Sequence, residues 1–383
     1  AFRPFIIGPL GPAQIACIRS WRRAGHEVGF VHLTDGRPLP LIAGAVDFYL
    51  PLSTDALSRD DGIAAMTNFL QCHRANGLTC LAYSLARRLH KASSRLPKET
   101  ALWLPSIEVI DRLESKTQQN SIARKAGLNL LPTAAVERAG SIPEREFFPV
   151  VLRPDDPTTV KPAFKIRICN STDDLRKFVD GLERLDRPLI AQPFIRGRNF
   201  VIHGYRTHNG ESCHWGFKVA RMLDGLSLTV EPAPVPTDLA ESCAAFAEAL
   251  DIVGVYHFEF IHERENDRYY FMEINGRLGG TTGKVYRCGF DEPALIPYCY
   301  EPGLSPPRQR IEAVTGTSKQ ALVKFLLRAA RRSQTTIFDY PDGNFWRKLA
   351  DLAPGIVLWC DEIFDSRDPR TTAAYFLQKI YGE

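Results

Sequence analysis

The sequence predicts an α/β protein of more than one domain. It has 383 residues, which is more than a single ordinary hydrophobic core accommodates. Strand and helix patterns alternate from the first residues to about residue 105, as they do in doubly wound βαβ domains. A later hairpin carries polar side chains at every second position, where a buried sheet would be apolar. We therefore expect an N-terminal βαβ domain over residues 1–105, a central domain over 106–310 and a small C-terminal α+β region over 311–383.

The N-terminal domain begins with the pattern strand, glycine turn, helix and strand. Its first helix has an apolar face made by Ile15, Ile18 and Trp21, and Gly25 ends it. The first loop, GPLGPA, lacks the GxGxxG spacing of dinucleotide sites, and no acid closes the next strand at the usual offset. We therefore favour a doubly wound domain whose first loop faces a substrate cleft over a nicotinamide or flavin site. Two further helical patterns continue the alternation, near residues 61–74 and 81–91.

The central domain combines helices with antiparallel strands. One helix ends at Gly127, and another begins after Ser171, whose hydroxyl is a typical N-cap. Between them a buried strand, FFPVVLRP, runs into a polar loop and returns as a second strand. Asn209 and Gly210 mark the turn of a later hairpin. We divide this domain into two subdomains, one over residues 106–170 that contains the polar loop and one over residues 171–310 that contains the hairpins. The remaining expected helices lie at 238–250, 318–332 and 369–381.

Composition excludes several classes of protein. The net charge of +4 and the pI near 8.5 suit an anionic small-molecule ligand, but they are far from the concentrated basic stripe of a nucleic-acid-binding protein. No apolar run reaches the roughly 18 residues that a membrane span needs, and the first apolar stretch is too short for a signal peptide. Nine cysteines are scattered without a CxxC pair, so we expect free thiols in a reducing cytoplasm and no zinc site.

A hairpin late in the central domain carries the most informative pattern. If its turn centres on Asn266, Glu259 lies opposite Glu273 and His257 lies opposite Asn275. Opposed side chains have Cβ atoms roughly 5 Å apart, and two carboxylates that close repel each other unless a cation lies between them. An all-oxygen ligand set suits Mg²⁺ or Mn²⁺. Alternation alone would fit a solvated hairpin face equally well.

The residues that follow the hairpin make the solvated face the weaker reading. Arg277 continues the alternation of Glu273 and Asn275, and the loop Gly279-Gly280 comes next. An arginine beside a metal is the usual clamp for a phosphate or a carboxylate. His257 shares the predicted face, but we expect it to be a packed or hydrogen-bonded strand residue.

The segment GVYHFEF…YYFMEINGR resembles the magnesium signature of the ATP-grasp superfamily, the fold of D-alanine–D-alanine ligase, biotin carboxylase and carbamoyl phosphate synthetase. The resemblance runs from about residue 111 to 285, and the preceding βαβ domain looks like the usual partner domain. It implies an ATP-grasp fold with ATP and Mg²⁺ (or Mn²⁺) as cofactors. The metal ligands that it implies are Glu259, Glu273 and Asn275.

The resemblance also implies which cations contact the phosphates and the reacting groups. Lys116, one position into its helix, matches the first phosphate-binding lysine, and Lys218 in HWGFKV matches a later one. Arg153 stands where most members have lysine. Arg277 would stabilise the transferring phosphoryl group or the acyl phosphate, and we count it with Lys218 as catalytic. The alternative for each lysine is an ordinary solvent-exposed side chain.

The adenine and ribose contacts follow from the segment LIAQPFIRGRN. Gln192 matches the hinge residue beside the adenine amine, with the backbone of Phe194 and Ile195 reading the edge of the base. Asn199 falls where the family usually has an acid that binds the ribose, so the ribose contact departs from the pattern.

The loop after Arg153 is the main departure from the family. Family members have a glycine-rich loop here, whereas residues 154–165 contain no glycine and several prolines. Lys161 and Lys165 are the cations that this loop offers to the phosphates. We predict that it is mobile without nucleotide and closes over the triphosphate, with Lys165 the more important of the two lysines.

The leading functional hypothesis is an ATP-dependent ligase that joins a carboxylate to an amine, or to a thiol, through an acyl phosphate. Small carboxylates and amines, free amino acids among them, are the expected partners, and ligases of this architecture are commonly homodimers. No Ser/His/Asp or Cys/His constellation suggests a covalent nucleophile.

Two other functions stay open at the level of the sequence. One is a nucleotide-binding regulatory module without ligase chemistry, which the unusual loop and Asn199 would suit. The other is contact with a nucleic acid or a membrane through the basic helix KQALVKFLLRAARRSQ at 319–334, although we favour an ordinary amphipathic helix there.

Overall fold

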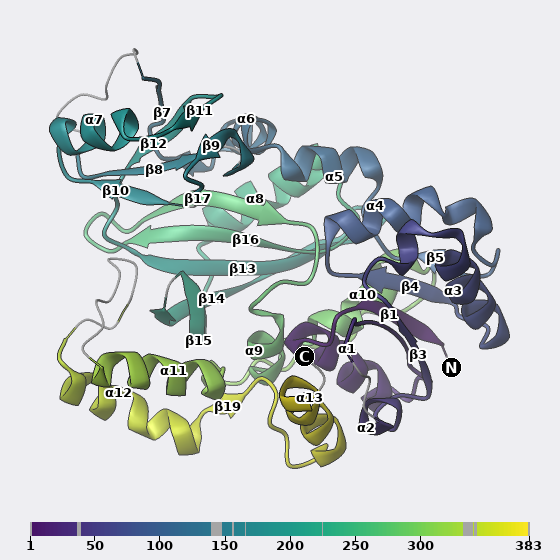
Figure 1. Ribbon diagram of the computed structural model, residues 1–383. Coiled ribbons are helices and arrows are strands. Elements are labelled where there is room, and N and C mark those ends of the chain that lie inside the picture. Colours follow the sequence, from purple (N-terminus) through teal and green to yellow (C-terminus); the bar gives the residue numbers. More distant parts are fainter. Residues whose placement is uncertain are drawn as a thin grey trace.

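The structure of the protein is a computed structural model (Figure 1). Its helices and strands are arranged in three layers. Its described residues are 2–36, 40–138, 148–154, 157–164, 166–223, 225–331, 340 and 343–381. Within these residues the strands form a five-stranded, a four-stranded, a two-stranded and an eight-stranded sheet.

The N-terminal domain is the doubly wound unit that the sequence predicts. Its five strands are all parallel, in the order β3-β2-β1-β4-β5. Ile15, Ile18 and Trp21 of the first helix are buried, and Gly25 follows its end with φ at +79°, a conformation that glycine adopts readily. The strands are β1 (Pro4–Gly8), β2 (Gly29–Leu33), β3 (Phe48–Leu52), β4 (Gly77–Cys80) and β5 (Ala101–Leu102). The helices are α1 (Pro12–Arg23), α2 (Pro40–Ala43), α3 (Asp60–Cys72) and α4 (Tyr83–Lys91).

Two short helices lead into the central domain. α5 (Ile107–Glu114) and α6 (Lys116–Lys125) each begin after a serine whose side chain caps the helix, Ser106 and Ser115. Lys116 is therefore the first residue of α6, as the sequence predicts. The sequence analysis did not anticipate α5.

A small sheet with the strand order β10-β8-β12-β7 forms the upper layer in Figure 1. It packs against α7 (Thr172–Asp180), which Ser171 caps as expected. The last of its strands along the chain, β12, ends at Pro193, beyond residue 170, where this subdomain was predicted to end. The strands are β7 (Ala134–Val136), β8 (Val150–Pro154), β10 (Arg167–Cys169) and β12 (Leu189–Pro193), and beside them β9 (Val160–Lys161) pairs with β11 (Arg184–Leu185).

The large sheet forms the middle layer, in the order β19-β18-β15-β14-β13-β16-β17-β6. Apolar residues of α8 (Thr237–Leu250) pack against one face, and those of α10 (Glu292–Tyr300), which follows α9 (Thr282–Arg287), pack against the other. The strands are β6 (Asn129–Leu130), β13 (Arg198–Arg206), β14 (Ser212–Leu223), β15 (Leu226–Ala233), β16 (Gly254–Glu263), β17 (Arg268–Asn275), β18 (Gly316–Thr317) and β19 (Cys360–Asp361).

The C-terminal region contains α11 (Lys319–Ala330), α12 (Phe345–Leu358) and α13 (Pro369–Tyr381). Its two short strands, β18 and β19, belong to the large sheet, so this region shares a sheet with the central domain. Leu322 and Phe325 of α11 pack with Leu352 of α12, which supports the reading of an ordinary amphipathic helix. No helix in the described part of the chain is long and apolar enough to cross a membrane.

Candidate functional site

The hairpin of β16 and β17 pairs its polar residues in the predicted register. Glu259 lies opposite Glu273, and His257 lies opposite Asn275. The side chain of each glutamate keeps 36% of its surface exposed. The fold therefore places two accessible carboxylates opposite each other on neighbouring strands.

A β-bulge at Met272 gives the strand this arrangement. Glu259 pairs with Glu273, but the next residue, Phe260, pairs with Phe271, which leaves Met272 as the extra residue. In a regular strand, residues 271 and 273 would share one face. Because of the bulge, Phe271 packs in the core beneath the sheet while Glu273 is paired on the face of Glu259.

Glu273 is held by two donors. Lys116 donates from Nζ to its Oε2, and Asn275 donates from Nδ2 to its Oε1 at 3.0 Å. Burial by itself raises the pKa of Glu273, but the Lys116 charge, these two hydrogen bonds and the nearby His257 outweigh it, so the pKa lies below its ordinary value. The side chain is thus kept in the charged form that a metal ligand requires.

The donor set fits a hard divalent cation. Two opposed carboxylates and the amide oxygen of Asn275 supply only oxygen atoms, which Mg²⁺ prefers, and waters complete its coordination. Among the described residues no group of three or more His, Cys, Asp or Glu side chains could hold a metal ion. A magnesium ion here would therefore rest on Glu259, Glu273 and Asn275, together with water and phosphate.

Arg277 lies next to this set and against the N-terminal domain. Its Nη2 donates to Asn275 Oδ1 at 3.4 Å, and its Nη1 donates to the carbonyl of Leu278 at 3.2 Å. The guanidinium lies 5.3 Å from the ring centre of Tyr83, whose hydroxyl accepts a 2.7 Å hydrogen bond from the backbone of Gly276. Burial raises the pKa of Tyr83 to about 12. The sequence analysis missed Tyr83, which lies 193 residues before Gly276.

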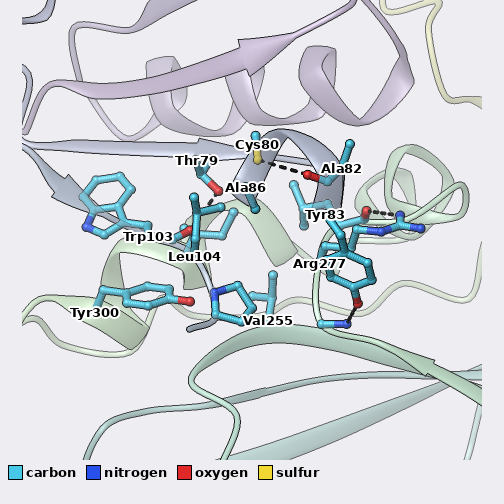
Figure 2. A pocket seen from close by; sticks show the side chains of 14 residues that line it. Thr79, Cys80, Ala82, Tyr83, Ala86, Trp103, Leu104, Val255, Arg277 and Tyr300 are labelled. Carbon is cyan, nitrogen blue, oxygen red and sulfur yellow. Dashed lines mark hydrogen bonds between the residues drawn. The ribbon is translucent and has the colours of Figure 1, made fainter. Parts of the chain in front are cut away.

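Figure 2 shows Tyr83 and Arg277 among the residues that line a small cavity between the N-terminal domain and the large sheet. The volume of this cavity is about 20 Å³, room for about one water molecule. Cys80 lies in its wall, and burial raises the pKa of this thiol to about 12, so it is not a reactive thiolate.

A larger cleft runs between the small sheet and the large sheet. Two adjoining cavities of about 710 and 450 Å³ share Leu131, Arg153, Gln192 and Met272 as lining residues. Met272, next to Glu273 in β17, lines both cavities, and Ile261, two residues beyond Glu259 in β16, lines the larger one, so the two strands that carry the carboxylates border the cleft. Arg153 contributes a cation at the junction of the two cavities.

The predicted hinge residues line this cleft. Gln192 is 9% exposed and donates to the hydroxyl of Thr133 at 3.1 Å. Phe194 and Ile195 follow it along the wall. The backbone N–H of Phe194 donates to the carbonyl of Pro149 at 2.7 Å, so this donor is already used within the protein.

The C-terminal region closes the other end of the cleft. The Tyr340 hydroxyl accepts a hydrogen bond from the backbone N–H of Asn199 at 3.3 Å, and Arg198 lies 5.6 Å from the centre of its ring. The backbone of Tyr340 pairs with Met222 on β14. Burial raises the pKa of Tyr340 to about 12. The sequence analysis missed Tyr340 because no local pattern links it to Asn199.

Two of the predicted phosphate-binding lysines, Lys218 and Lys161, are not brought to this group. Lys218 pairs with Phe200, whereas Glu259 pairs with Val201, so Lys218 lies on the opposite face of the sheet, where it forms an ion pair with Glu231 at 2.9 Å. Lys161 is exposed on β9 and forms an ion pair with Glu183 at 2.8 Å. Lys165 lies outside the described residues.

The loop that contains Lys161 is partly ordered by pairing. β9 hydrogen-bonds to β11, and Val160 is buried in the core of the small sheet. This pairing joins the loop to Arg184 and Leu185, which lie outside it. The predicted closure over a triphosphate stays a prediction.

All nine cysteines, each of which lies in the described part of the chain, are free thiols. This agrees with the absence of CxxC spacing in the sequence.

The predicted first loop of the N-terminal domain, GPLGPA, lies beside Gly283, where an added Cβ would come within 3.2 Å of both Pro12 and Glu362. The C-terminal region thus packs next to this loop.

Comparison with known proteins finds two curated proteins that are similar in sequence to part of this chain. The chain is 24% identical over 187 residues to the C-terminal section of the carbamoyl phosphate synthase large chain of Methanopyrus kandleri, a match that covers 45% of this chain and 34% of that protein. It is 21% identical over 193 residues to biotin carboxylase 1 of Bacillus subtilis, with 45% and 42% covered. The chain thus matches less than half the length of these two curated relatives. No protein-family model matches it.

Solved structures are similar over more of the chain. A biotin carboxylase-β,γ-ATP complex from Campylobacter jejuni has a TM-score of 0.59 and 18% identity, covering 81% of this chain and 73% of that one. The ADP complex of N5-carboxyaminoimidazole ribonucleotide synthetase has a TM-score of 0.62 and 12% identity, covering 99% and 98%. The L-amino acid ligase from Bacillus licheniformis has a TM-score of 0.56 and 16% identity, covering 77% and 73%. At these identities the similarity establishes the fold.

Proposed function

We propose that this chain, which has the ATP-grasp fold, is an ATP- and Mg²⁺-dependent ligase that joins a small carboxylate to an amine through an acyl phosphate. The observation that carries the proposal is the pairing of Glu259 with Glu273 on two strands that border the cleft between the two sheets, with Lys116 and Arg277 beside them. This face gathers two carboxylates and two cations on neighbouring elements. It suits the handling of a highly charged phosphate chain.

The cleft suits a nucleotide. Its larger part has a volume of about 710 Å³, within the usual range for cofactor sites. Leu131 and Met272 offer apolar surface for a base, while Arg153 and Arg198 supply positive charge along the wall. Solved neighbours of the same fold include complexes with ADP and with MgADP.

Each residue of the candidate site has its own proposed role in phosphoryl transfer. Glu259, Glu273 and Asn275 would hold Mg²⁺, which when bound offsets the charge of the phosphates. Lys116 adds a second cation next to Glu273. Arg277 is held two residues beyond Asn275, where its guanidinium can bind the acid substrate or the transferred phosphoryl group.

The chemistry then needs no protein nucleophile. An oxygen of the acid substrate attacks the γ-phosphorus, the bond to ADP breaks, and an acyl phosphate forms. The neutral amine attacks the acyl carbon, phosphate leaves with the bonding electrons, and the amine loses a proton to give an amide. Glu259 and Glu273 orient the nucleotide, and Arg277 orients the acid for the first step.

The identities of the acid and the amine are narrowed by the fold neighbours. One of these neighbours is named as an L-amino acid ligase, and another is a biotin carboxylase domain bound to bicarbonate. Both names indicate small carboxylic acids. We propose that free amino acids or similarly small acids and amines are the substrates, that the chain acts in the cytoplasm, and that it forms a homodimer, as one carboxylase neighbour does.

The direct test is ADP formation. The chain is incubated with ATP, Mg²⁺ and pools of amino acids and small acids, ADP is measured by a coupled assay, and products are identified by mass. We expect ADP release that depends on both an acid and an amine, and a product whose mass equals their sum minus water. A nucleotide-binding module without catalysis would instead be stabilised thermally by Mg·ATP and release no ADP with any pool.

A further inference from the structure

Beneath the candidate site lies a buried group of polar residues that the proposed reaction does not use. It consists of Glu292, His203 and His257, which are 0%, 0% and 3% exposed. They come from α10, β13 and β16, and they surround the loop from Arg277 to Thr282. Burying polar groups is costly unless they are hydrogen-bonded, so the bonds of this group identify its purpose.

Glu292 begins α10 and contacts the loop directly. Its Oε2 accepts a 2.6 Å hydrogen bond from the hydroxyl of Thr282, and its Oε1 accepts one from Nδ1 of His203 at 3.0 Å. The Thr282 hydroxyl in turn accepts a 3.0 Å hydrogen bond from the backbone N–H of Gly279. Both oxygens of Glu292 are thus used to fix one turn of the loop.

His203 extends the group to the next loop residue. With the proton on Nδ1 toward Glu292, the ring accepts at Nε2 from the hydroxyl of Thr281, 3.0 Å away. The order hydroxyl, imidazole and carboxyl is that of a nucleophilic triad. Thr281 is only 7% exposed, however, and lines none of the cavities described above, so the arrangement holds the loop in place and does not attack a substrate.

His257 connects this group to Arg277. Its Nδ1 donates to the backbone carbonyl of Arg277 at 3.2 Å, and its ring stacks on that of His203 with centroids 5.4 Å apart. The loop backbone also rests on the ring of His257, because a Cβ added at Gly279 would lie 2.3 Å from the Cε1 of that histidine.

The guanidinium of Arg277 lies against the ring of Tyr83, 5.3 Å from its centre. Its hydrogen bonds to Asn275 and Leu278 are long, at 3.4 and 3.2 Å, and therefore weak. Its position thus also depends on the backbone from which it projects.

We propose that Glu292, His203 and His257 are positioning residues that fix the loop 277–282 and thereby hold Arg277 at the reacting groups. The catalytic part of this inference rests on the proposed ligase function. The structural part, that these three side chains hold the loop, does not.

The first measurement is hydrogen exchange of the loop amides, which needs no turnover. Glu292→Gln keeps the size of the side chain but removes one acceptor oxygen. We expect faster exchange over residues 277–282 in this variant, with unchanged exchange in β1 and β4. The matched control is Glu301→Gln, at the far end of α10, where the carboxylate accepts from Trp103 and does not touch the loop. Unchanged loop exchange in Glu292→Gln would overturn the proposal.

A second variant covers the case in which Glu292→Gln does not fold. His257→Phe keeps a ring against His203 and Gly279 but removes the donor to the Arg277 carbonyl. His257→Asn places an amide nitrogen close to the position of Nδ1 and should restore slow exchange. Equal exchange in these two variants would contradict the role of this hydrogen bond.

The catalytic arm is a double-mutant cycle with Arg277→Lys. In the native background we expect Glu292→Gln to lower kcat about 10- to 100-fold with less change in KM for ATP, since a small displacement of a catalytic group has effects of this size. In the Arg277→Lys background the same change should cost much less. An equal loss in both backgrounds would overturn the catalytic part. If the native chain releases no ADP at all, the proposed function fails, while the exchange experiment still decides whether the loop is held in this way.

Discussion

The side chain of Glu273 takes part in more of the interactions of the candidate site than any other described here. It pairs across the hairpin with Glu259, accepts from Lys116 and Asn275, and follows the bulge that turns it to the cleft. The lowered pKa of Glu273 keeps it ionised through the neutral range. It therefore links the proposed metal ligands with Lys116, the first of the proposed phosphate-binding lysines.

The first prediction is that Glu273→Gln abolishes ADP release at saturating Mg²⁺ while the fold remains intact. The amide removes the negative charge that both Mg²⁺ and Lys116 require, and it adds no bulk. Turnover is measured by ADP release, and the fold is checked by circular dichroism and thermal unfolding. ADP release at the native rate would mean that Glu273 does not hold the metal.

The second prediction concerns Arg277→Lys. Lysine keeps the charge but loses the planar fork that binds two oxygens together. If Arg277 stabilises the transition state, kcat should fall about 10- to 100-fold, with a smaller change in KM for ATP. Steady-state kinetics separate the two constants. A variant altered in KM alone would place Arg277 in ground-state binding.

Some site residues could be predicted from the sequence, and others could not. The facing pair Glu259 and Glu273 was predicted from a turn centred on Asn266, and the structure reaches the same pairing through the bulge at Met272, which the sequence did not predict. Tyr83 and Tyr340 reach the site from distant parts of the chain and carry no local signal. The face on which Lys218 lies was predicted wrongly, because a shift of one residue in strand register moves a side chain to the other face of the sheet.

At the scale of elements, the loop between β17 and α9 is the most tightly defined part of the site. Its backbone passes directly over the ring of His257, and its threonines bond to buried side chains. The sequence predicts a loop at Gly279-Gly280, and the structure shows a packing reason for the first of these glycines.

The third prediction compares Gly279→Ala with Gly280→Ala. A Cβ at Gly279 would lie 2.3 Å from His257, so the loop or the ring must move, whereas a Cβ at Gly280 meets no atom within 4 Å. We expect Gly279→Ala to lower kcat about 10-fold or more, and Gly280→Ala to stay within about 2-fold of the native value. Equal activity of the two variants would mean that the loop tolerates displacement.

Helices and strands could be predicted from the sequence where the pattern that indicates them lies within one segment. The helix capped by Ser171 begins where the pattern indicates. The pairing of β9 with β11, and the entry of β18 and β19 into the large sheet, depend on strands of two residues each. Strands so short have no period from which they could be recognised.

At the scale of the whole molecule, the C-terminal region ties the N-terminal domain to the large sheet. Asp365, which is 2% exposed, accepts from Arg23 of α1 at 2.8 Å and from Arg287 of α9 at 2.5 Å. Burial by itself raises the pKa of Asp365, but the backbone bond from Arg367 and the charge and hydrogen bond of Arg287 outweigh it and hold the pKa well below its ordinary value. Three parts of the chain therefore meet at one carboxylate.

The fourth prediction is that Asp365→Asn lowers the free energy of unfolding by about 1–3 kcal/mol at pH 7. Because the pKa of Asp365 is lower in the folded state, its contribution is complete above the ordinary value of 3.8 and is lost as the pH falls below that value. Urea unfolding of both proteins from pH 7 to pH 3 should show the difference shrink at the acidic end. A difference independent of pH would contradict this account, and Asp180→Asn, at an exposed position, serves as the control.

The central claim is that a carboxylate is activated by ATP on this fold, and oxygen transfer tests it most directly. The chain is incubated with Mg·ATP, amines and a pool of small acids whose carboxylates carry ¹⁸O, and the released phosphate is analysed by mass. An acyl phosphate passes one carboxylate oxygen to phosphate, so we predict one ¹⁸O atom in each phosphate released. Phosphate without ¹⁸O would show that water attacks ATP, and it would contradict the ligase mechanism.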